Sequence, residues 1–286
     1  MAVNYRAWTR KQKVCRVLLY TFMILLATVF ILPLYYTAMT SFKPLDELMK
    51  FPPDFYVRRP TLQNFSDLLS ALDASTVPFV RYLFNSVFTT VISVFLCVAI
   101  SSMGAYGLVK HKVFCGRFWF GLIMIALMFP TTVIQIPNFV IINKLHLVNT
   151  YAVIIITKLC SPFYFFLIKT FIEQFPNEFL EAARLDGAGE LYIFRKIVIP
   201  FMKPAIATLI VFAFMNCWND GSTSILYITD DSLKLIPYAL STIGGSGVAR
   251  MGASAAVSFL MLIPPIVVFL SMQKNVIETM VYAGIK

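Results

Sequence analysis

Long apolar stretches alternate with shorter polar connections along the whole chain. A helix of about 20 residues rises about 30 Å, which matches the hydrocarbon thickness of a bilayer. Apolar runs of this length occupy residues 17–39, 84–108, 118–142, 151–172, about 206–227 and about 254–272. The pattern predicts an all-α, polytopic membrane protein with six transmembrane helices, forming a single transmembrane domain over residues 1–286.

A basic flank precedes the first apolar run, as it does in a secretory signal peptide. This run is too long for the apolar region of a signal peptide, and no small-residue cleavage site follows it. We therefore expect a retained transmembrane helix. The basic flank consists of Arg6, Arg10, Lys11, Lys13 and Arg16.

The basic residues also indicate the orientation, because cytoplasmic loops carry an excess of Lys and Arg. If residues 1–16 lie inside, most of the 24 Lys and Arg residues fall on the cytoplasmic side. This distribution predicts that both termini are cytoplasmic and that the connection 173–203, between spans four and five, is cytoplasmic too.

Composition agrees with a membrane protein, since 59% of the residues are hydrophobic, 13% are charged and the mean hydropathy is +0.78. A net charge of +10 raises the question of nucleic-acid binding. The charges are distributed between apolar runs and form no basic stripe, so we expect no nucleic-acid partner. Five cysteines without CxxC spacing indicate neither a disulfide framework nor a thiolate metal site.

The cytoplasmic connection 173–203 is long, charged and patterned as two short helices. Asn177 is a good N-cap, and Gly187 can adopt the left-handed conformation that ends a helix. A second helix is expected over about 190–199, before Pro200 and Pro204. The first helix carries a stripe of mostly small residues, namely Phe179, Ala182, Ala183 and Asp186. Such a stripe suits insertion into a groove on a partner protein, and an amphipathic hairpin lying on lipid headgroups is the alternative.

The same connection carries a family signature. The pattern EAA, three residues, G, nine residues, I, any residue, L, P is matched with Ile199 in the Leu position. The matching residues are Glu181, Ala182, Ala183, Gly187, Ile197 and Pro200. They resemble the EAA motif of the membrane subunits of bacterial ABC importers.

More of the chain is similar to the carbohydrate importer permeases related to the smaller membrane subunit of the maltose transporter. The similar positions are Asn85-Ser86, Ala105-Tyr106, Asn149-Thr150 and Trp218-Asn219-Asp220. The C-terminal stretch 277–286 follows the Gly-rich ending of that family only in part. The resemblance covers most of the chain from Asn85 onward.

The resemblance implies that the two short helices are coupling helices, which dock into a cleft on a cytoplasmic ATPase. The implied coupling residues are Phe179, Glu181, Ala182, Ala183, Asp186, Gly187 and Pro200. It also implies four kinds of partner: a second permease subunit, expected to form a heterodimeric pore, two ATPase subunits, an extracellular solute-binding protein, and membrane lipid. The protein is then expected in the bacterial plasma membrane, with ATP and Mg bound by the partner ATPase.

This chain has no Gly-Lys dipeptide and hence no GxxxxGK[ST] phosphate loop. Its two histidines, His111 and His146, lie far apart in loops, so neither a metal site nor a Ser-His-Asp arrangement is indicated. We therefore expect no catalytic residue, no metal and no cofactor bound by this chain.

Several polar side chains fall in or beside the apolar runs, where burial in lipid is costly unless they face protein or water. The candidates for a solute path are Tyr35, Asn85, Gln135, Asn138, Asn216, Trp218, Asn219 and Asp220. Hydrogen bonds between helices are the alternative role for these groups. Lys158 is expected to extend toward the outer surface. Prolines at 130 and 137 are expected to break span three, and those at 264 and 265 to break span six.

Together these features predict the permease subunit of an ATP-binding cassette importer that moves a carbohydrate into the cell without altering it. An importer of another solute, such as an amino acid or a peptide, is the first alternative. An ion-driven secondary transporter is a second, and it would call for carboxylates in the middle of spans. The nearest carboxylate is Asp220, close to an outer end.

Overall fold

The computed structural model describes residues 10–73, 77–111, 113–244 and 250–284, and these residues are helical or irregular, with none in a strand. The chain divides into two compact units, residues 1–70 with 246–259 and residues 71–245 with 260–286. The prediction of an all-helical protein is confirmed. The α-helices of the described part are α1 (Arg10–Ser41), α2 (Leu45–Leu48), α3 (Gln63–Asp73), α4 (Phe79–Lys110), α5 (Gly116–Leu127), α6 (Thr131–Lys144), α7 (Tyr151–Leu159), α8 (Pro162–Glu173), α9 (Glu178–Leu185), α10 (Glu190–Ile193), α11 (Ile199–Phe201), α12 (Lys203–Trp218), α13 (Ser222–Tyr227), α14 (Ile236–Gly244) and α15 (Met251–Gly284).

The first unit contains α1 and a folded connection after it. Asn64 ties this connection together, since its Nδ2 donates to the backbone oxygens of Ser41 at 2.8 Å and Lys43 at 2.7 Å. Glu47 accepts hydrogen bonds from the backbone N–H groups of Arg58 and Arg59, each at 3.1 Å. The connection 41–83 therefore has helices and internal hydrogen bonds in its described part.

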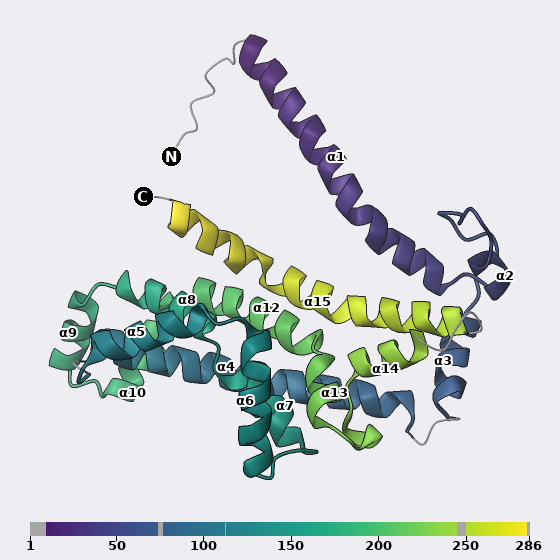
Figure 1. Cartoon of the computed structure of the whole chain (residues 1–286). Coiled ribbons are helices and arrows are strands. Elements are labelled where there is room, and N and C mark those ends of the chain that lie inside the picture. The colour runs from purple at the N-terminus through teal and green to yellow at the C-terminus, as the bar shows by residue number, and fades with distance from the viewer. Residues whose placement is uncertain (1–9, 74–76, 112, 245–249, 285–286) are drawn as a thin grey trace. The chain divides into compact units, whose positions relative to one another are not determined.

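In the second unit the long helix α4 is the central element and packs against α7, α8 and α12 (Figure 1). Its buried face consists largely of small and hydroxyl-bearing residues, which allow neighbouring helices to approach closely. These are Ser86, Thr89, Thr90, Ser93, Cys97, Ser101, Ser102 and Ala105. A face of this kind suits a helix surrounded by other helices in a membrane.

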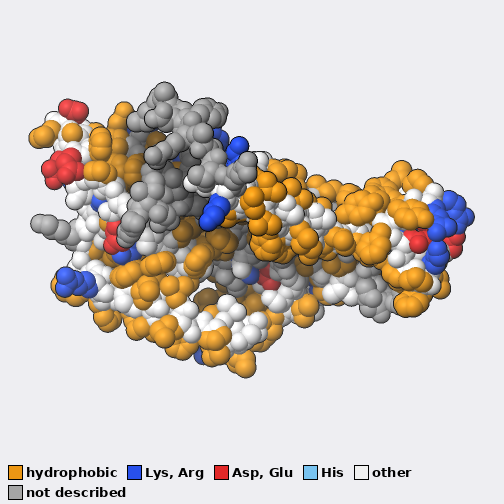
Figure 2. All heavy atoms as spheres, turned by 90° about the horizontal axis from the view of Figure 1, so that it is seen from above, with side chains coloured by type: hydrophobic (Ala, Val, Ile, Leu, Met, Phe, Trp, Pro, Cys, Tyr) orange, Lys and Arg blue, Asp and Glu red, His pale blue; other side chains and the backbone are white. Residues whose placement is uncertain are grey.

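Within the described ranges, three helices are long and apolar enough to cross a membrane, namely α1 over Lys11–Ser41, α4, and α15 over Met251–Ile277. Three bent pairs qualify as broken spans or re-entrant loops: α5 with α6 at 110°, α7 with α8 at 43°, and Glu190–Phe201 with Lys203–Trp218 at 79°. The part of the chain that the structure describes therefore holds between three and six candidate spans. Hydrophobic side chains dominate the visible surface (Figure 2), as expected of a protein whose solvent is lipid.

The structure corrects two details of the expected spans. The break in span three lies at Pro130, which precedes α6, while α6 continues through Pro137. The expected break in span six is wrong, because α15 continues through Pro264 and Pro265. Each proline removes one backbone donor, and membrane helices tolerate this loss where neighbouring groups satisfy the freed carbonyls.

The fifth apolar run also forms two helices where one was expected. Helix α12 ends at Trp218, and α13 begins at Ser222. Between them Asp220 accepts a hydrogen bond from the backbone N–H of Thr223 at 3.2 Å, in the first turn of α13. A side chain that bonds the backbone locally in this way competes with continuation of the helix.

Candidate functional site

The segment with the EAA signature forms a helix, a tight turn and a second helix. Gly187 follows α9 with a φ of +79°, which is the left-handed conformation expected from the sequence. The N–H of Ala188 donates to the oxygen of Ala183, and the N–H of Gly187 donates to that of Arg184, both at 3.0 Å. These bonds satisfy carbonyls at the end of α9 and set the direction of the chain into α10.

The side chain of Asn177 does not cap α9, contrary to the prediction from the sequence. Its side chain makes no capping bond, and its backbone lies in the right-handed helical region. Its Oδ1 instead accepts a hydrogen bond from Lys110 Nζ at 2.8 Å, and Lys110 also donates to the oxygen of Phe175 at 2.6 Å. The amide is therefore used to join the loop to the end of α4.

A carboxylate makes a second connection between this loop and α4. Glu190, the first residue of α10, accepts hydrogen bonds from Tyr106 Oη at 2.9 Å and from Arg184 Nε at 2.8 Å. His111 Nε2 lies 3.5 Å from the same carboxylate. The hydrogen bond from Arg184 lowers the pKa of Glu190 below its ordinary value.

The sequence pattern did not predict the pairing of Arg184 with Glu190, and Tyr106 stood out only through the family resemblance. Their opposite charges on either side of the turn at Gly187 were the available signal. The pairing becomes evident only when that turn brings α9 and α10 together.

The loop is anchored by an apolar core and presents other apolar side chains outward. Leu180 is buried in a cluster with residues of α4, α8 and α12. In contrast, the side chains of Phe179 and Leu185 are 60% and 89% exposed. Glu181 and Ala182 are also exposed, and Ala183 is half-buried. A solvent-exposed apolar surface on a rigidly held helix is suited to contact with another protein.

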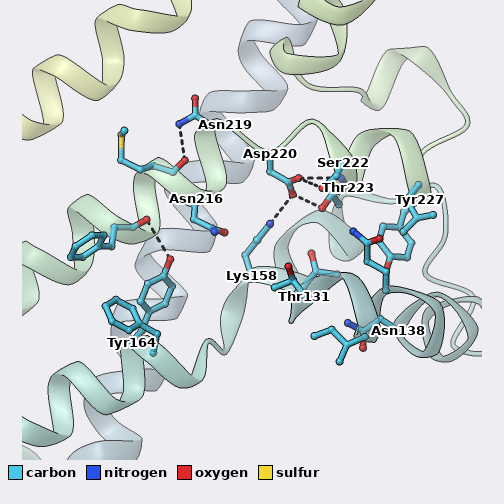
Figure 3. A pocket seen from close by; sticks show the side chains of 17 residues that line it. Thr131, Asn138, Lys158, Tyr164, Asn216, Asn219, Asp220, Ser222, Thr223 and Tyr227 are labelled. Carbon is cyan, nitrogen blue, oxygen red and sulfur yellow. Dashed lines mark hydrogen bonds and ion pairs between the residues drawn. The ribbon is translucent and has the colours of Figure 1, made fainter. Parts of the chain in front are cut away.

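A polar cavity of about 680 Å³ lies elsewhere in the second unit (Figure 3). Residues of α6, α7, α8, α12 and α13, with those of the turn before α13, form its walls. The cavity contains five of the predicted solute-path residues, which are Gln135, Asn138, Asn216, Asn219 and Asp220. Amides, hydroxyls and aromatic rings therefore surround one space.

The remaining predicted solute-path residues lie elsewhere. Asn85 is completely buried and donates from Nδ2 to the oxygens of Ser232 at 2.8 Å and Lys234 at 2.9 Å, while its Oδ1 accepts from Tyr151 Oη at 2.7 Å. This matches the alternative role of joining segments of the fold.

Trp218 is also buried away from the lining of the cavity. Its Nε1 donates to the oxygen of Met261 at 3.0 Å, and its ring stacks on that of Phe214 at a centroid distance of 5.7 Å. Tyr35 belongs to α1, in the other compact unit, where it is exposed.

Lys158 lies in the wall of the cavity and forms an ion pair, which the sequence did not predict. Its Nζ lies 2.7 Å from Oδ2 of Asp220, and the two side chains are only 19% and 6% exposed. Asp220 also accepts from Ser222 Oγ at 2.6 Å and from the hydroxyl of Thr223 (Figure 3). A buried cation is far more stable beside a carboxylate than alone, which explains the pairing of Lys158 with Asp220.

No group of three or more His, Cys, Asp or Glu side chains that could hold a metal ion occurs among the residues described. The five cysteines are free thiols.

Residues 97–282 match the model of the family described as the binding-protein-dependent transport system inner membrane component. The chain belongs to this family. Components of this family are permease subunits embedded in the plasma membrane and are not enzymes, which confirms the predictions of family, location and absence of catalysis.

Relatives of this inner membrane component are similar over nearly their whole length. It is 28% identical to the arabinooligosaccharides transport system permease protein AraQ of Bacillus subtilis (strain 168), over 96% of each chain. It is 27% identical to the melibiose/raffinose/stachyose import permease protein MelC of the same organism, over 89% of this chain and 91% of MelC. It is 29% identical to the sn-glycerol-3-phosphate transport system permease protein UgpE of Escherichia coli O1:K1 / APEC, over 92% of this chain and 94% of UgpE.

A solved structure shares the fold. A chain of a bacterial ABC transporter involved in the import of the acidic polysaccharide alginate superposes with a TM-score of 0.81. The superposition covers 94% of this inner membrane component and 99% of that chain, at 22% sequence identity.

Proposed function

We propose that this inner membrane component is the permease subunit of an ATP-binding cassette importer that moves a carbohydrate into the cell. The observation that carries the proposal is the polar cavity, which presents amides and hydroxyls together with the rings of Phe163 and Phe212. Such groups can hydrogen-bond sugar hydroxyls and stack on the apolar faces of sugar rings. The names of AraQ and MelC, both oligosaccharide permeases, support the same solute class.

The proposed topology has six spans, formed by α1, α4, the bent pair α5–α6, the bent pair α7–α8, α12 and α15, with both termini in the cytoplasm. This arrangement places the loop 173–203 on the cytoplasmic side, between spans four and five. The excess of Lys and Arg in the connections assigned to that side supports it.

In this proposal the exposed face of α9 docks into a cleft on an ATPase subunit. Phe179, Glu181 and Ala182 are exposed and available for this contact. The hydrogen bonds of Glu190 and Lys110 then transmit the displacement of the loop to α4. Two ATPase subunits, a second permease and an extracellular solute-binding protein complete the transporter, and rocking of the two permease halves exposes the cavity to each side in turn.

Uptake into proteoliposomes that contain the full complex and its solute-binding protein tests the proposal. A panel of labelled arabinotriose, raffinose, sn-glycerol 3-phosphate, leucine and a tripeptide would be supplied with ATP inside. We expect ATP-dependent uptake of a carbohydrate, unaffected by an ionophore that dissipates ion gradients. Uptake of leucine or the tripeptide alone would support the alternative solute classes, and sensitivity to the ionophore without ATP would support an ion-driven transporter.

A further inference from the structure

The relatives of this chain differ in the charge of the solutes that their names give. Arabino-oligosaccharides, raffinose and stachyose are uncharged, whereas sn-glycerol 3-phosphate and alginate are anionic. Family membership therefore leaves the charge of the solute undetermined. The cavity offers independent evidence on this point, because its lining determines which charge can be desolvated there.

Among the described residues that line the cavity, two side chains are charged, Lys158 and Asp220, and they have opposite signs. Their ionised groups are 2.7 Å apart, so their charges largely cancel. The other polar lining groups are amides and hydroxyls, which carry no net charge. The cavity is therefore formally neutral.

The surroundings of Asp220 favour retention of this pair when a solute enters. The Oδ1 of Asp220 accepts from Ser222 Oγ and from the N–H of Thr223, and Oδ2 accepts from the Thr223 hydroxyl and from Lys158 Nζ. These bonds hold the carboxylate in place at the turn between α12 and α13. An anionic solute that recruited Lys158 would leave a nearly buried carboxylate without its counter-ion, which is strongly unfavourable.

We propose that Asp220 is a specificity-determining residue, which neutralises Lys158 so that the cavity accepts an uncharged polyhydroxyl solute and disfavours an anionic one. This inference rests on the proposed function and adds the charge class of the carbohydrate. It assigns the ion pair a role in selectivity, in addition to its role in joining α7 to the turn before α13.

Charged thiol reagents measure the electrostatic potential of the cavity without knowledge of the solute. An Asn216→Cys reporter would be placed in a complex whose five native permease cysteines are replaced by serine. Its modification rates with anionic methanethiosulfonate ethylsulfonate and cationic methanethiosulfonate ethyltrimethylammonium would then be compared. An uncompensated charge within the cavity is expected to change the anionic-to-cationic rate ratio by about tenfold or more.

The two single variants are expected to change the anionic-to-cationic rate ratio in opposite directions. Asp220→Asn leaves Lys158 uncompensated and should raise the ratio, whereas Lys158→Met leaves Asp220 uncompensated and should lower it. The double variant should return to within about threefold of the parent. A matched control is Asp231→Asn, which removes the carboxylate of the Lys234–Asp231 pair, 2.6 Å apart and outside the cavity lining, and should leave the ratio unchanged.

Transport supplies a second measurement, with the carbohydrate taken up in the panel above and trigalacturonate as an anionic competitor. The double variant should retain carbohydrate uptake better than either single variant, and trigalacturonate should inhibit Asp220→Asn more than the parent. Rate ratios that neither single variant changes would overturn the charge assignment alone. Absence of uptake of every carbohydrate tested would overturn the proposed function, and the solute class with it.

Discussion

At the scale of single residues, Gly187 shows how backbone conformation restricts the amino acid at a position. A Cβ added there would meet no atom within 4 Å, so space does not require glycine. The requirement comes from the φ of +79°, where an L-residue costs about 1 to 2 kcal/mol. Asn149 also has a positive φ, at 64°, and is a residue type that tolerates this region.

We predict that Gly187→Val lowers ATP-dependent uptake at least about tenfold, because a β-branched residue resists the left-handed conformation and alters the turn between α9 and α10. Gly189→Val is the matched control, since Gly189 has an extended φ of −72° and equally open surroundings. Uptake would be normalised to the amount of permease inserted in the membrane. Equal uptake by the two variants would show that the turn is not required.

Asn85 illustrates a polar residue whose role is structural. We predict that Asn85→Ala lowers the thermal unfolding temperature of the detergent-solubilised permease by several degrees. The change removes hydrogen bonds to Ser232, Lys234 and Tyr151, whose polar groups are buried or partly buried. A buried polar group left without a partner costs about 1 to 3 kcal/mol of stability.

The matched control for Asn85 is Asn219→Ala. Asn219 lines the cavity directly after α12, and its side-chain Nδ2 donates a hydrogen bond to the backbone oxygen of Met215 at 3.0 Å. This variant should alter uptake and leave the unfolding temperature within about one degree of the parent. A larger loss of stability in Asn219→Ala than in Asn85→Ala would contradict this division of roles.

At the scale of secondary-structure elements, the loop 173–203 is joined directly to α4. Leu180 anchors the loop in the apolar core, and Lys110 and Tyr106 bind it by hydrogen bonds. Since α4 also packs against α7, α8 and α12, a displacement of the loop reaches the helices around it. The physical consequence is that a displacement of this loop is not absorbed by a flexible linker.

We predict that Glu190→Gln reduces uptake about threefold to tenfold while ATP hydrolysis by the full complex continues. The amide can still accept from Tyr106, but the charge-assisted bond to Arg184 is lost. Tyr106→Phe, which removes only one neutral-donor bond, should have a smaller effect. The number of solutes moved per ATP hydrolysed is the measurement, and an unchanged ratio in Glu190→Gln would argue against transmission through this contact.

At the scale of the whole molecule, the topology depends on how the bent helix pairs cross the membrane. The pair α5 and α6 is bent by 110°, and this angle permits either one broken span or a re-entrant loop. The two arrangements place the connection after α6 on opposite sides of the membrane. The proposed six-span topology requires it to be outside.

Cysteine accessibility tests this topology in a cysteine-free background. We predict that Leu145→Cys and Met49→Cys, both at exposed positions, react with a membrane-impermeant maleimide in intact spheroplasts. A permease that retains only the native Cys115, which is also exposed, should react in inside-out vesicles instead. Labelling of Leu145→Cys from the inside would show that α5 and α6 form a re-entrant loop and that the six-span topology is wrong.

The features that the sequence by itself determined are those with a local physical cause. The length of the apolar runs determined the membrane setting and the helical class, because a lipid environment requires backbone groups to be satisfied within each helix. The position of Gly187 after a helical stretch determined the turn, because few residue types adopt a positive φ. The EAA pattern was likewise readable from the sequence, since its spacing lies within the one short segment 173–203.

Only the tertiary structure decided which polar groups meet. Lys158 and Asp220 are far apart in the sequence, and either alone suggested a different role from the ion pair that they form. The amide of Asn85 is a group that can bind a sugar, but in the folded chain it donates hydrogen bonds to the backbone oxygens of residues 232 and 234. The partner of a buried polar group depends on how helices that are far apart in the sequence pack together. Hydrophobic periodicity predicts the helices and does not predict this packing.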